Sequence, residues 1–169
     1  MASLILTVVG PDRPGLVNAL SAAVAARGGS WLESRMARLA GQFAGIVAVE
    51  APAALIEDLR ALESQGLRIV VQEALAPPPP AGERLTLEVV GNDRPGIVRD
   101  VTAVLAACGV NIEELTTDVS SGSFSGEALF KALAVLRAPN AEAVEAARAG
   151  LEKLGNDLMV DFQVAGAEG

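Results

Sequence analysis

The feature that most constrains this chain is an internal repeat with an offset of 81 residues. The segment Val8–Val17 aligns with Val89–Val98, and eight of the ten aligned pairs are identical. The similarity continues beyond these segments, since Gly28 aligns with Gly109. Self-similarity at a fixed offset is the signature of a repeated structural unit. The chain is therefore expected to contain two copies of one domain.

A run of four prolines, Pro77–Pro80, separates the two copies. Each proline lacks an N–H and fixes φ near −65°, so the run favours extended polyproline II over helix or central strand. We expect residues 1–75 to form the first domain, residues 76–82 a stiff linker and residues 83–165 the second domain. Residues 166–169 remain as a tail.

Composition removes several classes of function. The chain has 169 residues, of which 51% are apolar, so it can bury a core and is not disordered. It has no histidine and a single cysteine. Imidazole bases, Cys-His nucleophilic pairs, zinc clusters and internal disulfides are thereby excluded, and no metal or other cofactor is expected.

The charge is acidic, with 13 Lys and Arg against 21 Asp and Glu, a net charge of −8. Such a chain repels phosphate backbones and anionic lipids, so we expect no direct binding of nucleic acid or membrane. The N-terminus lacks a basic leader, and no apolar run approaches the roughly 20 residues that span a membrane. We expect a cytoplasmic protein. The second half of the chain, from residue 83 to the end, holds 14 acidic against 7 basic residues, which favours a basic partner.

The hydrophobic pattern of each copy predicts the order β-α-β-β-α-β. The expected strands are Leu4–Val9, Trp31–Leu39, Gln42–Glu50 and Leu67–Ala74, and then Leu85–Val90, Asn111–Val119, Ala128–Leu136 and Leu158–Val164. The first helix of each copy is expected to begin at Pro14 or Pro95, with proline at its first position, and to end at Gly28 or Gly109. The second helices are expected over Ala53–Ser64 and Ala141–Leu154.

This order indicates an α+β fold class, with two ferredoxin-like βαββαβ domains. Each would have an antiparallel four-stranded sheet with two helices on one face, leaving a partly apolar sheet face uncovered. A domain of this size buries only about 60% of the surface of its unfolded chain. We therefore expect the copies to pack together and the chain to form a homodimer.

The turn between the first strand and first helix of each copy is the candidate site. There the first amides of the helix have no partners in the helix, and the dipole end is positive, which suits an anion. The candidate ligand-binding residues are Asp12, Arg13, Gly15 and Leu16 in the first turn, Asp93, Arg94, Gly96 and Ile97 in the second, and Asn111 at the start of a strand.

These residue types complement both ends of an amino acid. Arginine can clamp a carboxylate, glycine lets the carboxylate approach the backbone, and aspartate can pair with the ammonium group. Structural roles remain open beside these. Asp12 and Asp93 can cap the helix, Arg13 and Arg94 can form surface ion pairs, and Asn111 can be a turn residue.

The two turns are not equivalent. Asn111 aligns with Ser30, and Arg99 aligns with Asn18. These more polar residues favour the second turn as the ligand site.

A βαββαβ unit whose first turn has the pattern Gly-x-Asp-Arg-Pro-Gly resembles the ACT domain, and both copies match. The paired arrangement without a catalytic domain, with Glu33–Leu39 in one copy and Val110–Leu115 in the other, is similar to the glycine cleavage system transcriptional repressor family. The resemblance implies a non-enzymatic regulator that responds to a small amino acid such as glycine. It also implies action through a protein partner, such as a transcription activator.

Two other functions stay open. The chain could be an oligomerisation module or a regulatory subunit of a metabolic enzyme, without a ligand pocket. An acylphosphatase-like enzyme on the same fold would need an arginine for phosphate and an asparagine for water. Arg13 and Asn18 would fill those roles in the first copy, but Arg99 replaces the asparagine in the second. This disfavours an enzyme.

Overall fold

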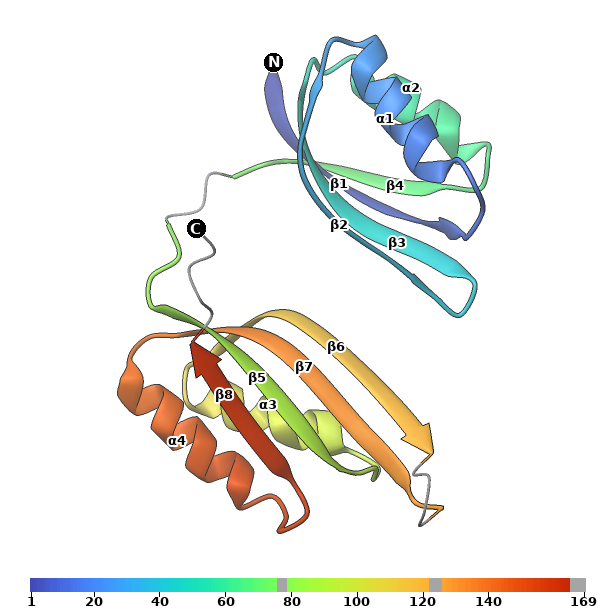
Figure 1. The fold of residues 1–169 in the computed structure, drawn as a ribbon. Coiled ribbons are helices and arrows are strands. Elements are labelled where there is room, and N and C mark those ends of the chain that lie inside the picture. Colours follow the sequence, from blue (N-terminus) through green and yellow to red (C-terminus); the bar gives the residue numbers. More distant parts are fainter. Residues whose placement is uncertain (76–78, 122–125, 165–169) are drawn as a thin grey trace. The chain divides into compact units, whose positions relative to one another are not determined.

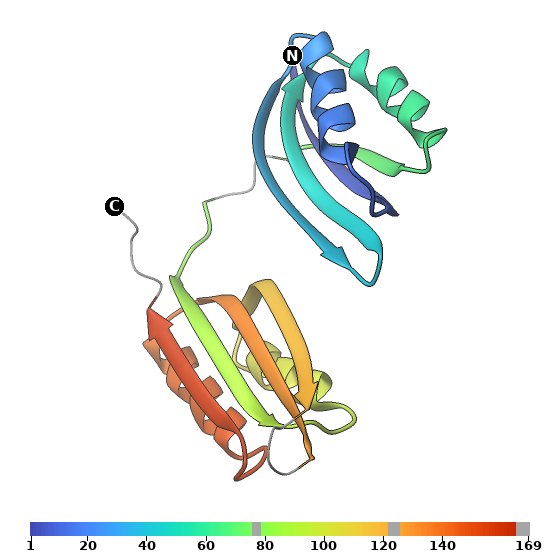
Figure 2. The same ribbon diagram turned by 45° about the vertical axis from the view of Figure 1, so that its right-hand side comes forward.

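The computed structural model describes residues 1–75, 79–121 and 126–164, and the chain forms two compact units that divide between residues 77 and 78 (Figure 1). Part of the expected linker, 76–78, and the expected tail lie outside the described residues. In each unit both helices lie against one face of the sheet, and the other face carries no helix among the described residues (Figures 1 and 2).

The first unit contains six elements in the expected order. They are β1 (Ala2–Pro11), α1 (Leu16–Ala26), β2 (Ser30–Leu39), β3 (Gln42–Ala51), α2 (Leu55–Glu63) and β4 (Arg68–Glu73). The strands form an antiparallel sheet in the order β2-β3-β1-β4.

The second unit repeats this arrangement. Its elements are β5 (Glu83–Asn92), α3 (Ile97–Ala107), β6 (Asn111–Ser121), β7 (Ala128–Ala138), α4 (Ala141–Glu152) and β8 (Met159–Val164). The sheet order is β6-β7-β5-β8, again antiparallel. The predicted α+β class with two ferredoxin-like βαββαβ domains is confirmed.

Each unit has its own apolar core between sheet and helices. Alternate residues of the inner strands point toward the helices, which produces the period of two seen in the sequence. In the first unit β1 and α1 contribute Leu4, Leu6, Val8, Leu16, Leu20 and Val24. In the second unit β5 and α3 contribute Leu85, Leu87, Val89, Ile97, Val101 and Leu105.

The structure corrects the predicted start of α1 and α3. Neither helix begins at its proline: they begin at Leu16 and Ile97, each after a glycine with φ of 89° or 81°. Proline followed by a glycine with positive φ is the pattern of a tight turn of type II, which places proline before the helix. The preceding strands also extend beyond their predicted ends at Val9 and Val90, to Pro11 and Asn92.

The predicted helix ends are confirmed, because Gly28 and Gly109 follow α1 and α3 with φ of 67° and 69°. This left-handed conformation closes a helix at little steric cost only for glycine. Within the described ranges, no helix is both long and apolar enough to cross a membrane.

Candidate functional site

The two βα turns present helix N-termini without a side-chain cap. The residues before α1 and α3 are glycines, so neither has a side chain that can accept a hydrogen bond from the first amides. By contrast, the side chain of Asn140 caps α4 and accepts a bond of 2.9 Å from the amide of Ala143. The N-termini at the two turns can therefore receive an external anion.

In the first turn, Arg13 contacts the backbone. Its Nη2 donates a hydrogen bond of 2.7 Å to the carbonyl oxygen of Gln65, in the loop between α2 and β4. This contact joins the turn to a residue 52 positions further along the chain, at the same end of the sheet. The acceptor is a neutral carbonyl, which competes less strongly for this guanidinium than a carboxylate would.

In the second turn, Arg94 is held by a carboxylate. Its Nη1 lies 2.7 Å from Oδ2 of Asp100, in the first turn of α3, and Arg99 lies 3.0 Å from the other oxygen. Hydrogen bonds from Arg94 and then Arg99 lower the pKa of Asp100 below its ordinary value. The structure thus shows the surface ion pair that the sequence had left as one of two possible roles for Arg94. The first unit has Ala19 at the position of Asp100, so it cannot form this pair.

The two aspartates do not cap the helices, so that interpretation is wrong for both. Asp12 lies 2.7 Å from Nε of Arg38, at the end of β2. In the second unit Val119 stands at the position of Arg38. Among the residues that the structure describes, no hydrogen bond or ion pair involves the side chain of Asp93.

Leu16 and Ile97 belong to the two cores. Their side chains are 5% and 4% exposed, so only their backbone can meet a ligand. Both turn glycines are required by their positive φ. A Cβ at Gly15 would meet nothing within 4 Å, and one at Gly96 would lie 3.3 Å from the flexible guanidinium of Arg99. The presence of glycine is thus explained by the turn itself.

Asn111 lies at the other end of α3 from the second turn, which is about 15 Å away along a helix of this length. It lines an open groove of about 470 Å³ beside α3 together with Arg99 and Thr102. The structure therefore separates Asn111 from Asp93 and Arg94. Of the polar residues that line the groove, Arg99 is the one nearest in sequence to the second turn.

Three contact residues were missed from the sequence: Asp100, Gln65 and Arg38. The aligned copies do show that Asp100 is new relative to Ala19, which is a signal of a changed turn. The contacts of Gln65 and Arg38 carry no such signal, because both residues reach the turn only through the folding of distant segments.

Comparisons with known proteins agree with the fold. The family model of the ACT domain matches residues 2–72 and again residues 83–165. The glycine cleavage system transcriptional repressors of Escherichia coli (strain K12) and Shigella flexneri are each 30% identical to this chain over 120 residues. The alignment covers 68% of this chain and 63% of each repressor, so the chain matches less than two thirds of their length.

Two crystal structures are similar over nearly the whole chain. An unknown protein from Galdieria sulphuraria is 32% identical, with a TM-score of 0.84, and the match covers 98% of this chain and 99% of that one. A structure assigned to a glycine cleavage system transcriptional repressor has a TM-score of 0.67 and 20% identity, covering 96% and 98% of the two chains. At that identity the second match supports the fold alone.

Proposed function

Because this chain belongs to the ACT domain family and carries two copies of the domain, we propose that it is a non-enzymatic regulatory protein that senses a small amino acid. Its resemblance to the glycine cleavage system transcriptional repressors supports a role in regulating transcription for glycine or amino-acid metabolism. The observation that carries the proposal is the pair of βα turns, each with a helix N-terminus without a side-chain cap next to an arginine.

The proposed ligand lies at one or both turns. The amides at the start of α1 or α3 bind its carboxylate, and the neighbouring arginine adds a charge-assisted hydrogen bond. The two turns offer different halves of this recognition. Among the described residues Arg13 is held by a neutral carbonyl, whereas Asp93 has no side-chain partner there and suits the ammonium group. The preference for the second turn is therefore weakened by the ion pair of Arg94.

The regulatory output runs through a protein partner, such as a transcription activator, and through a homodimer of this chain. A ligand changes that output only if it binds one conformation more tightly than another. Direct contact with DNA is not part of the proposal, because a net charge of −8 opposes it. In a binding assay at physiological salt, tight association of the isolated protein with promoter DNA would contradict this.

Isothermal calorimetry with a panel of amino acids tests the site. We expect saturable binding of a small amino acid such as glycine, and we expect Arg13→Ala or Arg94→Ala to weaken it. A lost hydrogen bond to a charged group is worth roughly 1.5 to 3 kcal/mol, or about 10- to 150-fold in affinity. Since Asp100 competes for Arg94, the larger loss is expected for Arg13→Ala.

The exposed Arg60, in the last turn of α2, supplies a matched control. Arg60→Ala removes the same charge from a side chain with no contact to either turn among the described residues, and it should leave the affinity unchanged. If an amino acid binds and neither turn variant weakens it, the turns are structural and the site assignment fails. If no amino acid binds, the alternative of a ligand-free oligomerisation or regulatory subunit is favoured instead.

A further inference from the structure

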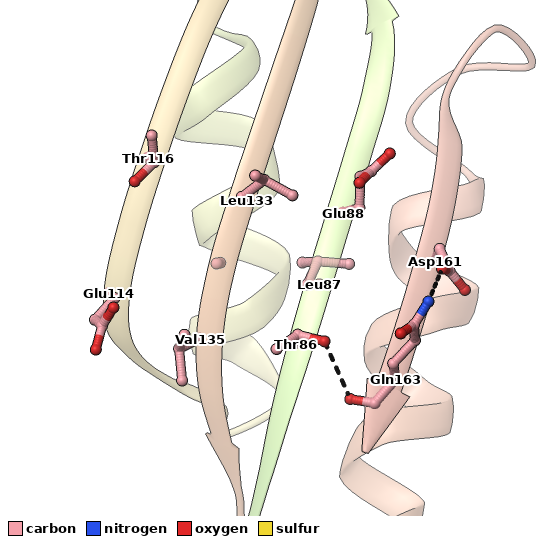
Figure 3. A pocket seen from close by; sticks show the side chains of 10 residues that line it. Thr86, Leu87, Glu88, Glu114, Thr116, Leu133, Val135, Asp161 and Gln163 are labelled. Atoms are coloured by element: carbon pink, nitrogen blue, oxygen red, sulfur yellow. Dashed lines mark hydrogen bonds between the residues drawn. The ribbon is translucent and has the colours of Figure 1, made fainter. Parts of the chain in front are cut away.

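The sheet face of the second unit that carries no helix contains a groove of about 290 Å³ (Figure 3). Its apolar floor includes Leu133 and Val135 on β7. Glu114 of β6 lies on one side of this floor, and Glu88 of β5 and Asp161 of β8 lie on the other (Figure 3). We name these five residues the acidic groove.

The first unit shows that the fold does not require these charges. In the second unit Glu88 is paired with Leu133 and Asp161 in the sheet register. In the first unit Thr7 occupies the place of Glu88, paired with Ile46 and Val70. The same backbone thus places two uncharged residues, Thr7 and Val70, where the second unit has two carboxylates.

The third carboxylate differs in its surroundings. Glu114 aligns with Glu33 of the first unit, whose carboxylate lies 3.1 Å from Arg35 on the same strand. The residue aligned with Arg35 in the second unit is Thr116. Glu114 is paired differently, since Nη2 of Arg84 lies 3.8 Å from its carboxylate. The carboxylates that distinguish the acidic groove from the first unit are therefore Glu88 and Asp161.

This arrangement opposes folding. Glu88 and Asp161 lie directly opposite each other on neighbouring strands, and like charges at such positions are destabilising. Their protein contacts compensate only in part. The ammonium group of Lys131 is 3.9 Å from Glu88, and Asp161 accepts a bond of 2.8 Å from the neutral amide of Gln163. A pair that weakens the fold and is absent from the other copy points to a cationic partner.

We propose that the acidic groove docks a basic segment of the protein partner through which this regulator acts. Lysine or arginine side chains suit it, because their stems can lie on the apolar floor while their charged ends reach the carboxylates. Leu133 is 45% exposed, so it is available for such a contact. A second copy joined through this same face would bring like charges together, which disfavours it as the occupant. The inference rests on the proposed action through a partner, not on the amino-acid site.

The test uses the full chain and a synthetic peptide of four Arg-Val repeats as the probe. We expect saturable binding in calorimetry and no binding of the matching Glu-Val peptide. The double variant E88T/D161V carries the residues that the first unit has at the same positions, Thr7 and Val70. We expect it to bind the probe at least about tenfold more weakly, the change produced by 1.4 kcal/mol.

A matched control removes the same number of charges from the helix side of the unit. Glu142→Gln with Glu152→Gln, both exposed on α4, should leave the affinity within about twofold of the parent. Equal weakening by this control would mean that net charge alone attracts the peptide, and the inference would fail. It would also fail if E88T/D161V bound the probe normally, or if spermidine or Mg²⁺ bound the groove more tightly than the peptide.

Folding and the amino-acid site are monitored in the same samples. E88T/D161V should melt at or above the temperature of the parent, because the repulsion is removed. Its affinity for the amino acid should be unchanged. Peptide binding therefore tests the proposal for the acidic groove, and amino-acid binding separately tests the proposal for the turns. The reciprocal variant Thr7→Glu with Val70→Asp should gain peptide binding, and failure to gain any would count against the role of this carboxylate pair.

Discussion

The two βα turns have nearly the same sequence but opposite side-chain pairing. In the first turn Asp12 is paired with Arg38, and Arg13 donates to the backbone carbonyl of Gln65. In the second turn Arg94 is paired with Asp100, and Asp93 has no side-chain partner within the described part of the chain. The first turn thus has the more available cation and the second turn the more available anion.

The difference arises outside the shared motif. Proline and glycine fix the backbone of both turns in the same way, since they restrict φ locally. The partners depend on two other aligned positions: Ala19 against Asp100, and Arg38 against Val119. A repeated motif therefore specifies its backbone, while the residues that fold against it specify what its side chains can bind.

The largest expected effect tests whether the two units are independent. Leu6 and Leu87 are equivalent core residues, 0% and 2% exposed, and replacing either by alanine should destabilise its own unit by about 2–5 kcal/mol. Trp31 is the single tryptophan and lies in the first unit, so its fluorescence during urea unfolding reports that unit. Leu6→Ala should shift this transition and Leu87→Ala should not.

Circular dichroism serves as the control, because it detects both units. It should show a destabilised transition in each variant. Equal shifts of the Trp31 transition in the two variants would mean that the units unfold together.

An intermediate effect tests whether the turns have the same backbone requirement. Gly15→Ala and Gly96→Ala each force a residue with a Cβ into a left-handed conformation, which costs roughly 1–2 kcal/mol. We expect similar losses in the free energy of unfolding, measured in urea. A much larger loss at Gly96 would show that crowding against Arg99, absent at Gly15, also contributes.

A bulkier substitution at this position, Gly96→Val, would be strained in the same way and is therefore a poor probe of ligand binding. Any loss of affinity would combine the steric block with a distorted turn. The arginine variants are the cleaner test because they leave the glycines in place.

The smallest expected effect concerns pH. The pKa of Asp100 is held below its ordinary value of 3.8 by Arg94 and Arg99, so its ionised form stabilises the folded second unit. This stabilisation is present above the unfolded pKa and is lost as the pH falls through the lower folded pKa. The parent should therefore have a higher Tm than Asp100→Asn at neutral pH. This difference should vanish in acid, below pH 3.8.

The first unit provides the control for this prediction. Ala19→Asp places a carboxylate at the position of Asp100, and it should introduce a similar pH dependence there by drawing Arg13 away from Gln65. A difference between parent and Asp100→Asn that persists unchanged at low pH would show that packing, not charge, is responsible.

Much of the fold could be predicted because it depends on local patterns. The alternating set Leu4, Leu6 and Val8 is buried in β1, as expected for one face of a strand, and Gly28 correctly marked the end of α1. The start of α1 was misplaced because a proline suits both the first helical position and the second position of a tight turn. Only the positive φ of Gly15 distinguishes the two, and the sequence permits either.

The candidate site was predictable only in part. The turns and their residues follow from the repeat, but the helix cap that the sequence left open for Asp12 is not formed, and β2 instead brings Arg38 within 2.7 Å of it. Asn111 was grouped with the turn residues, whereas α3 separates it from them.

The sequence by itself determined that this protein has two βαββαβ units, which strand and helix faces are buried, and where the two turns lie. These properties follow from short-range periodicity and from the restricted φ of proline and glycine. Tertiary structure alone decided that Asp12 pairs with Arg38, that Arg13 donates to the carbonyl of Gln65, and that Glu88 and Asp161 lie opposite each other on neighbouring strands. The reason is that strand register and loop packing bring together residues far apart in sequence, and no local pattern records those distances.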